Sequence, residues 1–292
     1  MELVRFDKDN LCPNCSSGNH ITGSQRCWGV SYQKSFICTR DSGIAKKVPS
    51  GFLHWYDDCD CGRNHGDTML NTDPTNSSDL SGEQIKKNYA EVIWNNSYPI
   101  NNTTAQKYLH NRRLYIDDSS VLRYNPSIPH FKTNTWHESL ICKISDEFDH
   151  LTGIQRIYLS GGFKANIEPN KMTLGSALTN AVRFGGEPKE TLGIAEGIET
   201  ALTVHSILNI PVWACLGSTF LHRLKLPSNS TLKNIMIFAD PDSAGAESLA
   251  KAQDTWSSRY NVIDRRPRNT TKDYNDLLMQ DEQLTKHLLL RK

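Results

Sequence analysis

The sequence contains no apolar run long enough to cross a membrane. No stretch approaches the eighteen or so consecutive apolar residues that a membrane helix needs, and the mean hydropathy of −0.54 is that of a water-exposed chain. The opening residues, MELVRFDKDN, are charged and do not resemble a secretory signal. We therefore expect a protein of the cytoplasm that has no membrane partner.

An excess of one charge is also missing. The 33 basic and 32 acidic residues leave a net charge of +1, so any surface for nucleic acid must be a local patch. The sequence has no G-x-x-x-x-G-K-[ST] run, which argues against a P-loop helicase on this chain. At 292 residues, the chain has room for one large domain or for two to three small ones.

Changes in composition divide the chain into four parts. Residues 1–66 hold six of the eight cysteines and few apolar runs, so we expect a small module that needs a bound metal to fold. Residues 67–82 are polar and typical of a linker. Residues 83–190 combine helical spacing with short strand-like runs, which predicts an α+β subdomain. Residues 191–292 alternate short apolar runs with helical segments, which predicts an α/β domain with a parallel sheet covered on both faces.

Acidic residues follow two predicted strands of this last part. Glu196 follows TLGIA, whereas Asp240 and Asp242 follow IMIFA. The carboxyl ends of parallel strands meet at one edge of a sheet, where such sheets bind ligands. Residues two apart on an extended segment point the same way, so both aspartates can reach one hard cation. Mg²⁺ accepts one or two carboxylates together with water and phosphate oxygens, and the pattern therefore predicts a metal-dependent phosphoryl-transfer site.

A structural role for the same residues is the alternative. Asp240 could simply end its strand, and Asp242 could cap the helix that follows it. That interpretation would be the better one for an isolated D-x-D, but the matching Glu196-Gly197 after another strand favours the metal site. Glu199, on the next helix, is expected at the surface or as a first-turn residue rather than as a ligand.

A third acidic patch lies in TKDYNDLL near the end of the sequence. Its residues are Lys272, Asp273 and Asp276. A lysine beside two acids is as often a solvated turn as a functional group. In the functional interpretation, the two aspartates support the metal site and Lys272 contacts a phosphate.

Residues 191 to about 278 resemble a Toprim domain, the catalytic fold of bacterial-type DNA primases, topoisomerases and certain nucleases. The resemblance rests on Glu196-Gly197 and on the D-x-D-x-x-G run from Asp240 to Gly245. The EGIETAL and KDYND segments resemble the Toprim primases of phages, plasmids and other mobile elements. Upstream segments look like the first part of that catalytic core, so the resemblance covers about two thirds of the chain: KYLHNRRL, LRYNPSIPH, LTGIQRIYLS, KMTLG and AVRFGG.

This resemblance implies a DNA primase that makes short RNA primers from nucleoside triphosphates on a single-stranded DNA template, using Mg²⁺ or Mn²⁺. Asp240 and Asp242 would hold the metal, and Glu196 would be a further ligand or the base. The implied setting is a bacterial cell, with the gene carried by a phage or plasmid and a separate replicative helicase as a partner. The expected nucleotide- or DNA-binding residues are basic: Arg156, Lys171, Arg183 and Lys272, with Arg156 and Lys171 favoured over the other upstream cations Arg112, Arg113 and Arg123.

The cysteines of the first part have metal-ligand spacing. Cys12, Cys15, Cys27 and Cys38 form C-x2-C-x11-C-x10-C, which suits one tetrahedral Zn²⁺. The segment resembles the zinc ribbon that precedes Toprim domains in phage and plasmid primases, although it lacks their second C-x-x-C. Sets that use Cys59, Cys61 or His20 are the alternatives. Aromatic and basic residues interleave in this part, which suits single-stranded DNA.

Two other functions fit parts of the same pattern. The acids of a Toprim nuclease direct water at a phosphodiester, but the expected zinc ribbon and the primase-like upstream segments argue against cleavage. A non-catalytic single-strand-binding or regulatory protein would have no chemical reason to retain Glu196, Asp240 and Asp242 together.

Overall fold

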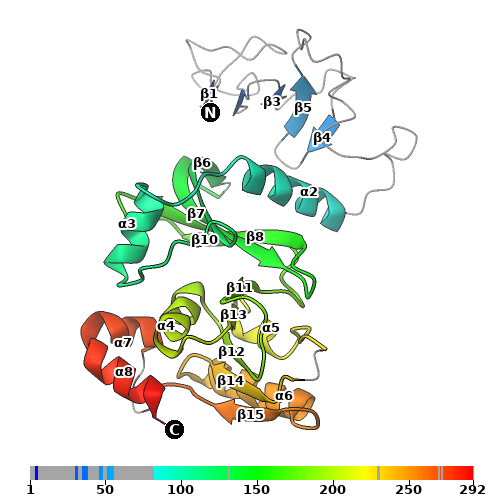
Figure 1. Ribbon diagram of the computed structural model, residues 1–292. Helices are drawn as coiled ribbons and strands as arrows, with labels where there is room; N and C mark the ends of the chain where they lie inside the picture. Colours follow the sequence, from blue (N-terminus) through cyan, green and yellow to red (C-terminus); the bar gives the residue numbers. More distant parts are fainter. Residues whose placement is uncertain are drawn as a thin grey trace. The chain divides into compact units, whose positions relative to one another are not determined.

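The computed structural model describes residues 82–291 except 131, 134, 229, 230, 269 and 271, and five short strands before residue 82. The chain divides into two compact units, Met1–Tyr89 and Ala90–Lys292 (Figure 1). Within the described ranges, no helix has both the length and the apolar character that crossing a bilayer requires.

The first unit contains a five-stranded antiparallel sheet in the order β1-β2-β3-β5-β4. Its strands are β1 (Val4–Arg5), β2 (Val30–Ser31), β3 (Ser35–Cys38), β4 (Lys46–Val48) and β5 (Gly51–Trp55). The predicted zinc ligands Cys12, Cys15 and Cys27 lie outside the described residues, as do the alternatives His20, Cys59 and Cys61. Only the backbone of Cys38 is described, at the end of β3. The zinc site therefore stays a prediction.

The helices α2 (Gly82–Asn95) and α3 (Thr104–Asn111) form where the helical spacing predicted them. Thr103 begins α3 as its N-cap, because its side chain accepts a hydrogen bond from the backbone N–H of Gln106. The antiparallel sheet that follows has the order β10-β8-β7-β6, with β9 paired to β8. Its strands are β6 (Leu122–His130), β7 (Thr135–Ser145), β8 (Leu151–Ser160), β9 (Phe163–Lys164) and β10 (Lys171–Gly175). The expected α+β architecture is confirmed.

Proline explains the position of β6 at the edge of this sheet. Pro126 and Pro129 cannot donate a backbone hydrogen bond, and proline is therefore confined to edge strands and bulges. The pairing of β6 with β7 is irregular between Asn125 and Ile128, on either side of Pro126.

The last part forms the predicted parallel sheet, in the order β11-β13-β12-β14-β15. Strands β12 to β15 are parallel, and β11 is an antiparallel edge strand contributed by the AVRFGG segment. The strands are β11 (Val182–Phe184), β12 (Thr191–Ala195), β13 (Val212–Ala214), β14 (Asn234–Phe238) and β15 (Asn261–Asp264). The helices are α4 (Ile198–Leu208), α5 (Ser218–Leu221), α6 (Ser243–Trp256), α7 (Tyr274–Gln280) and α8 (Glu282–Leu290).

Two hydrophobic cores cover the two faces of the parallel sheet. Ala195 and Phe238 belong to the first core, which also contains side chains of α3, α4, α7 and α8 and of the antiparallel strands β7 and β8. Ile194 and Ile237 belong to the second core, which α5 and α6 complete. Successive residues of a strand point to opposite faces, so each central strand is apolar throughout. Because the first core is shared, the α+β part and the parallel sheet form a single unit.

Candidate functional site: acids at the carboxyl edge of the parallel sheet

Glu196 and Asp240 meet at the carboxyl ends of two adjacent strands. Glu196 directly follows β12, and Asp240 lies two residues beyond the end of β14. The two strands pair in parallel with Ala195 opposite Phe238, which brings the following residues side by side. The backbone N–H of Asp240 donates a hydrogen bond of 3.1 Å to Oε1 of Glu196. The structure thus brings together the two acids that the motif placed 44 residues apart.

The electrostatics of this pair favour a bound cation. Burial, together with the charges of Asp240 and Asp242, raises the pKa of Glu196 to about 7. The pKa of Asp240 is also raised, first by burial and then by the charges of Asp273, Asp242 and Asp276. Carboxylates that raise one another's pKa repel each other when ionised, and a cation between them would relieve that repulsion.

Asp242 caps helix α6, as the structural interpretation of the D-x-D run expected, and it also lies near Glu196 and Asp240. It is the N-cap of α6, and its Oδ1 accepts a hydrogen bond of 2.7 Å from the N–H of Gly245. The residue is exposed, and its second carboxylate oxygen has no protein hydrogen bond among the contacts of the described residues. Capping and metal binding therefore use different oxygens and do not exclude each other.

Gly245 allows α6 to begin close to Asp240. A Cβ atom at this position would overlap the backbone carbonyl oxygen of Asp240. Only glycine therefore allows the first turn of the helix to approach the end of β14 this closely. This requirement explains the glycine of the D-x-D-x-x-G run.

The third acidic patch lies near the other two. Asp273 is the N-cap of α7 and accepts a hydrogen bond of 2.8 Å from the N–H of Asp276. The Asp276 carboxylate pairs with the guanidinium of Arg112, just beyond α3, at 3.0 Å. Both aspartates are close enough to Asp240 to raise its pKa. The half-exposed Lys272 immediately precedes this cap.

Lys171 is the predicted basic residue that the structure brings to the acids. It is exposed at the start of β10, and its charge lowers the pKa of both Glu196 and Asp240, opposing the effect of burial. Lys171 comes from the α+β part, whereas the acids come from the parallel sheet. The site is therefore composed of both parts of the second unit.

The structure places Arg156 on the opposite face of the antiparallel sheet from Lys171. In the pairing of β10 with β8, Met172 lies opposite Arg156 and Lys171 lies opposite Ile157, so the two cations point to different faces. Arg156 is 2% exposed, and its Nε and Nη1 have no hydrogen-bond partner within the described part of the chain. The pairing therefore places Arg156 on the face of the antiparallel sheet opposite to that of Lys171, and its role in binding nucleotide or DNA stays a prediction.

The guanidinium of Arg183 is held within the protein. It donates to the backbone oxygen of Asp146 at 2.7 Å and to Oε1 of Glu187 at 2.9 Å, and it lies 4.3 Å above the Trp213 ring. These contacts use one donor on each terminal nitrogen, and Nε is buried with no hydrogen-bond partner among the described residues. Nothing in the sequence indicated this arrangement, because its partners come from three separate segments.

Glu199 occupies one of its two expected positions, the first turn of the helix, but it is buried and not at the surface. It lies in the first turn of α4 with 8% exposure, where its Oε1 pairs with Nζ of Lys164 and accepts from the hydroxyl of Tyr108, both at 2.6 Å. Burial alone would raise its pKa, but Lys164 and Tyr108 lower it to about 2. Residues 198–204 of α4 are all buried, so the first two turns of the helix are covered on every side.

Polar contacts join α3 to α7 beside the acids. Besides the ion pair between Arg112 and Asp276, the guanidinium of Arg113 donates to the backbone oxygen of Leu278 at 3.1 Å. The side chain of Asn275 donates to the backbone oxygen of Arg112, also at 3.1 Å. The chain segment that follows α3 therefore fixes the third acidic patch.

The donor set suits a cation that keeps part of its water shell. Among residues 82–291, with their few gaps, no three His, Cys, Asp or Glu side chains converge tightly enough to hold an ion by themselves. Mg²⁺ is usually bound by one or two carboxylates, with waters and substrate phosphates completing its octahedron. Glu196, Asp240 and the outer oxygen of Asp242 fit that requirement.

Two family models match separate parts of the chain. Residues 191–283 match the family model described as "Toprim domain", and residues 84–184 match one described as "Domain of unknown function (DUF7146)". No curated protein matches the chain.

Three primases are among the solved structures with a similar fold. The primase fragment of the bacteriophage T7 primase-helicase is 13% identical, with 64% of this chain and 70% of that chain covered and a TM-score of 0.46. A DNA primase domain from Pseudomonas aeruginosa is 11% identical, with coverage of 71% and 78% and a TM-score of 0.49. The zinc-binding and RNA polymerase domains of the Aquifex aeolicus primase are 14% identical, with coverage of 73% and 62% and a TM-score of 0.48. The parallel sheet, its acids and the family match together identify residues 191–283 as a Toprim domain.

Proposed function

We propose that this protein is a DNA primase that joins nucleoside triphosphates on a single-stranded DNA template. The observation that carries the proposal is the pair of acids at the carboxyl edge of the Toprim sheet, Glu196 and Asp240. They are joined by a hydrogen bond, their pKa values are raised in part by neighbouring acids, and the basic Lys171 lies near them.

Each residue has a role in nucleotidyl transfer. Asp240 and Asp242 would hold Mg²⁺ or Mn²⁺, Glu196 would be a further ligand or the base, and Asp273 and Asp276 would support the metal site. When bound, the metal would offset the charge that develops on the phosphoryl oxygens.

The proton and the phosphates also have partners among the residues of this chain. The 3′-hydroxyl oxygen forms a bond to the α-phosphorus, the bond to the β-phosphate breaks, and pyrophosphate leaves. If Glu196 does not bind the metal, it would accept the hydroxyl proton as the general base. Lys171 would contact the phosphates.

Synthesis is favoured over cleavage by the part of the chain that precedes the Toprim domain. The segments KYLHNRRL, LRYNPSIPH and KMTLG resemble those of primases of mobile elements, and KMTLG forms β10, which supplies Lys171. A nuclease would need the same acids but not the primase-like segments that precede them.

The first unit would select the template. We propose that Cys12, Cys15, Cys27 and Cys38 bind Zn²⁺, on the strength of their spacing and of the basic and aromatic residues between them. Zinc analysis of a Cys12→Ser variant tests this; unchanged zinc content would shift the site to a set with Cys59 and Cys61. A separate replicative helicase and a phage or plasmid gene belong to the same proposal.

One assay tests the catalytic proposal. Purified protein is incubated with single-stranded DNA, labelled ribonucleotides and MgCl₂, alongside Asp240→Asn, Glu196→Gln and the control Asp254→Asn. Asp254 is an exposed residue of α6 that makes none of the contacts described above. We expect short labelled oligomers from the wild type and the control only. Template cleavage without synthesis would favour the nuclease, and DNA binding that ignores Mg²⁺ and both site substitutions would overturn the catalytic proposal.

A further inference from the structure

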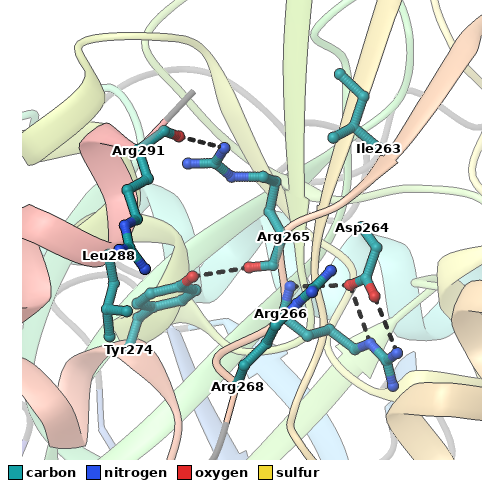
Figure 2. A pocket seen from close by; sticks show the side chains of 8 residues that line it. All are labelled: Ile263, Asp264, Arg265, Arg266, Arg268, Tyr274, Leu288 and Arg291. Atoms are coloured by element: carbon teal, nitrogen blue, oxygen red, sulfur yellow. Dashed lines mark hydrogen bonds and ion pairs between the residues drawn. The ribbon is translucent and has the colours of Figure 1, made fainter.

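An arginine-rich pocket lies at the carboxyl end of β15, the strand next to β14. The pocket has a volume of about 470 Å³. Figure 2 shows the side chains that line it. Its wall contains Asp264 and Tyr274, two aliphatic side chains and four arginines: Arg265, Arg266, Arg268 and Arg291. The arginines come from two separate parts of the sequence, the segment after β15 and the end of α8. The acids described above do not line this pocket.

The single carboxylate of the pocket neutralises only one of the four arginines. Asp264 accepts two hydrogen bonds from the guanidinium of Arg266, from Nε at 3.1 Å and from Nη2 at 3.0 Å. No ion pair of Arg265, Arg268 or Arg291 with a carboxylate occurs within the described part of the chain. Among the residues that the structure describes, the wall of the pocket therefore carries four positive charges and one negative charge.

Two of the arginines have a structural role, and two do not. Arg266 pairs with Asp264, and the guanidinium of Arg265 donates to the backbone oxygens of Leu289 and Arg291, which ends helix α8. The side chains of Arg268 and Arg291 are exposed at the same pocket, and the fold has no evident need of their charges. Their convergence with Arg265 is the feature that calls for a ligand.

The pocket is also held in place. The backbone N–H of Arg265 donates to the backbone oxygen of Ile237 at 2.9 Å, and its own backbone oxygen accepts from the hydroxyl of Tyr274 at 2.9 Å (Figure 2). Strand β14 and helix α7 thus fix the segment that bears Arg265, Arg266 and Arg268. A ligand would meet a preformed wall, which lowers the ordering cost of binding.

Size, charge and position indicate a phosphate-bearing small molecule. Pockets for small ligands measure roughly 300–1,000 Å³, and a guanidinium binds phosphate oxygens through two parallel hydrogen bonds. Open parallel sheets bind ligands beyond the carboxyl ends of their strands, where this pocket lies. A nucleic-acid backbone would be followed by a strip of cations, whereas these four arginines surround one compact cavity.

We propose that this pocket binds the polyphosphate chain of a small molecule without the help of a metal. A nucleoside triphosphate and inorganic pyrophosphate share this chemistry. The pocket is distinct from the acid site, and the proposal does not depend on primase activity. Arg268 and Arg291 would provide most of the binding, because Arg265 and Arg266 already have protein partners.

Calorimetric titration of the full chain in EDTA tests the proposal. The ligands are sodium tripolyphosphate, pyrophosphate and ATP, and the protein is compared with Arg268→Ala/Arg291→Ala. The matched control is Arg259→Ala, an exposed arginine 5.4 Å from the Tyr260 ring and outside the pocket. We expect tripolyphosphate to bind the wild type and the control equally, and the double variant to bind at least tenfold more weakly. Tighter binding of ATP than of tripolyphosphate would identify the nucleotide as the source, and equal binding would show that only the phosphates are recognised.

Two further measurements separate this proposal from the others. Asp240→Asn should keep the affinity for tripolyphosphate in EDTA even if it abolishes primer synthesis. Absence of tripolyphosphate binding to the folded wild type, or equal binding to the folded double variant, would overturn the proposal. The proposal would also be overturned if the binding of single-stranded DNA required Arg268 and Arg291 while tripolyphosphate did not bind the protein.

Discussion

Replacing Glu196 by glutamine should stabilise the protein in the absence of metal. The glutamine side chain would keep the oxygen that accepts the hydrogen bond from the N–H of Asp240, so the local geometry should persist. The substitution removes a half-buried negative charge that lies beside Asp240 and Asp242. Under the proposed function these acids bind a cation, and without that cation their charges oppose folding.

The size of the effect follows from the raised pKa of Glu196. Its pKa rises from the ordinary value of 4.5 to about 7, and each pKa unit corresponds to about 1.36 kcal/mol. A fully buried group would thus contribute about 3 kcal/mol; because Glu196 is only half-buried, solvent screening reduces this to about 1–2 kcal/mol.

The effect should depend on pH in one direction. The folded wild type holds a proton on Glu196 at pH values where the unfolded chain has lost it, so its stability falls as the pH rises from about 4.5 through about 7. The stability of Glu196→Gln does not fall in this way, because glutamine carries no charge at any of these pH values. Its advantage in the free energy of unfolding should therefore be small near pH 5 and reach about 1–2 kcal/mol near pH 8.

Urea unfolding in EDTA and in excess MgCl₂ measures both parts of the argument. Mg²⁺ should stabilise the wild type and the control Asp254→Asn, and it should stabilise Glu196→Gln much less, because a ligand that binds only the folded state raises its stability. The prediction is wrong if Glu196→Gln is less stable than the wild type near pH 8 in EDTA, or if Mg²⁺ stabilises it as strongly as the wild type.

Two substitutions test the surroundings of the acids. Gly245→Ala should cost about 1–3 kcal/mol and weaken the response to Mg²⁺, because the new Cβ displaces the backbone of Asp240. The control Ala246→Gly, at an exposed neighbouring position, should cost about 1 kcal/mol and keep the stabilisation by Mg²⁺. If urea unfolding showed the same stabilisation by Mg²⁺ for both variants, the displacement of Asp240 would not be the cause. Lys164→Met should cost about 3–5 kcal/mol at neutral pH, because it leaves the buried carboxylate of Glu199 without the cation that pairs with it. Adding Glu199→Leu should recover most of that loss, and a double variant as unstable as the single one would show that packing, not charge, is responsible.

The contacts between α3 and the Toprim helices explain why the acid site needs more than the Toprim domain. Arg112 pairs with Asp276, and Tyr108 and Lys164 hold Glu199 in the first turn of α4. Helix α4 begins two residues after Glu196, so these contacts fix the end of β12 from the side of the α+β part. A Toprim fragment alone would expose the carboxylate of Glu199 and would lose Lys171.

The sequence predicted the acids because their signals are local. An apolar run followed by an acid and a helical segment is visible within about a dozen residues, and the D-x-D spacing needs only the alternation of an extended chain. The alternation of strands and helices likewise predicted the parallel sheet, which brings the ends of β12 and β14 together.

The roles of the basic residues could not be predicted in the same way. Lys171 and Arg156 looked alike in sequence, and the register of β10 against β8 places them on opposite faces. That register depends on the loop between the strands and on which face is buried, and a shift by one residue would exchange the two. The burial of Glu199 could not be predicted for a related reason, since it depends on α3 and β9 packing over α4.

The sequence alone predicts the parallel sheet, the acids at its carboxyl edge and a zinc site, because each of these has a signal in residues that lie close together in the chain. Only the tertiary structure decided which cations face those acids and that Arg291 joins Arg265 and Arg268 around one pocket. These residues lie far apart in the chain or on alternate faces of a strand. Their meeting depends on strand register and on the return of α8 to the edge of the sheet, which no local pattern records.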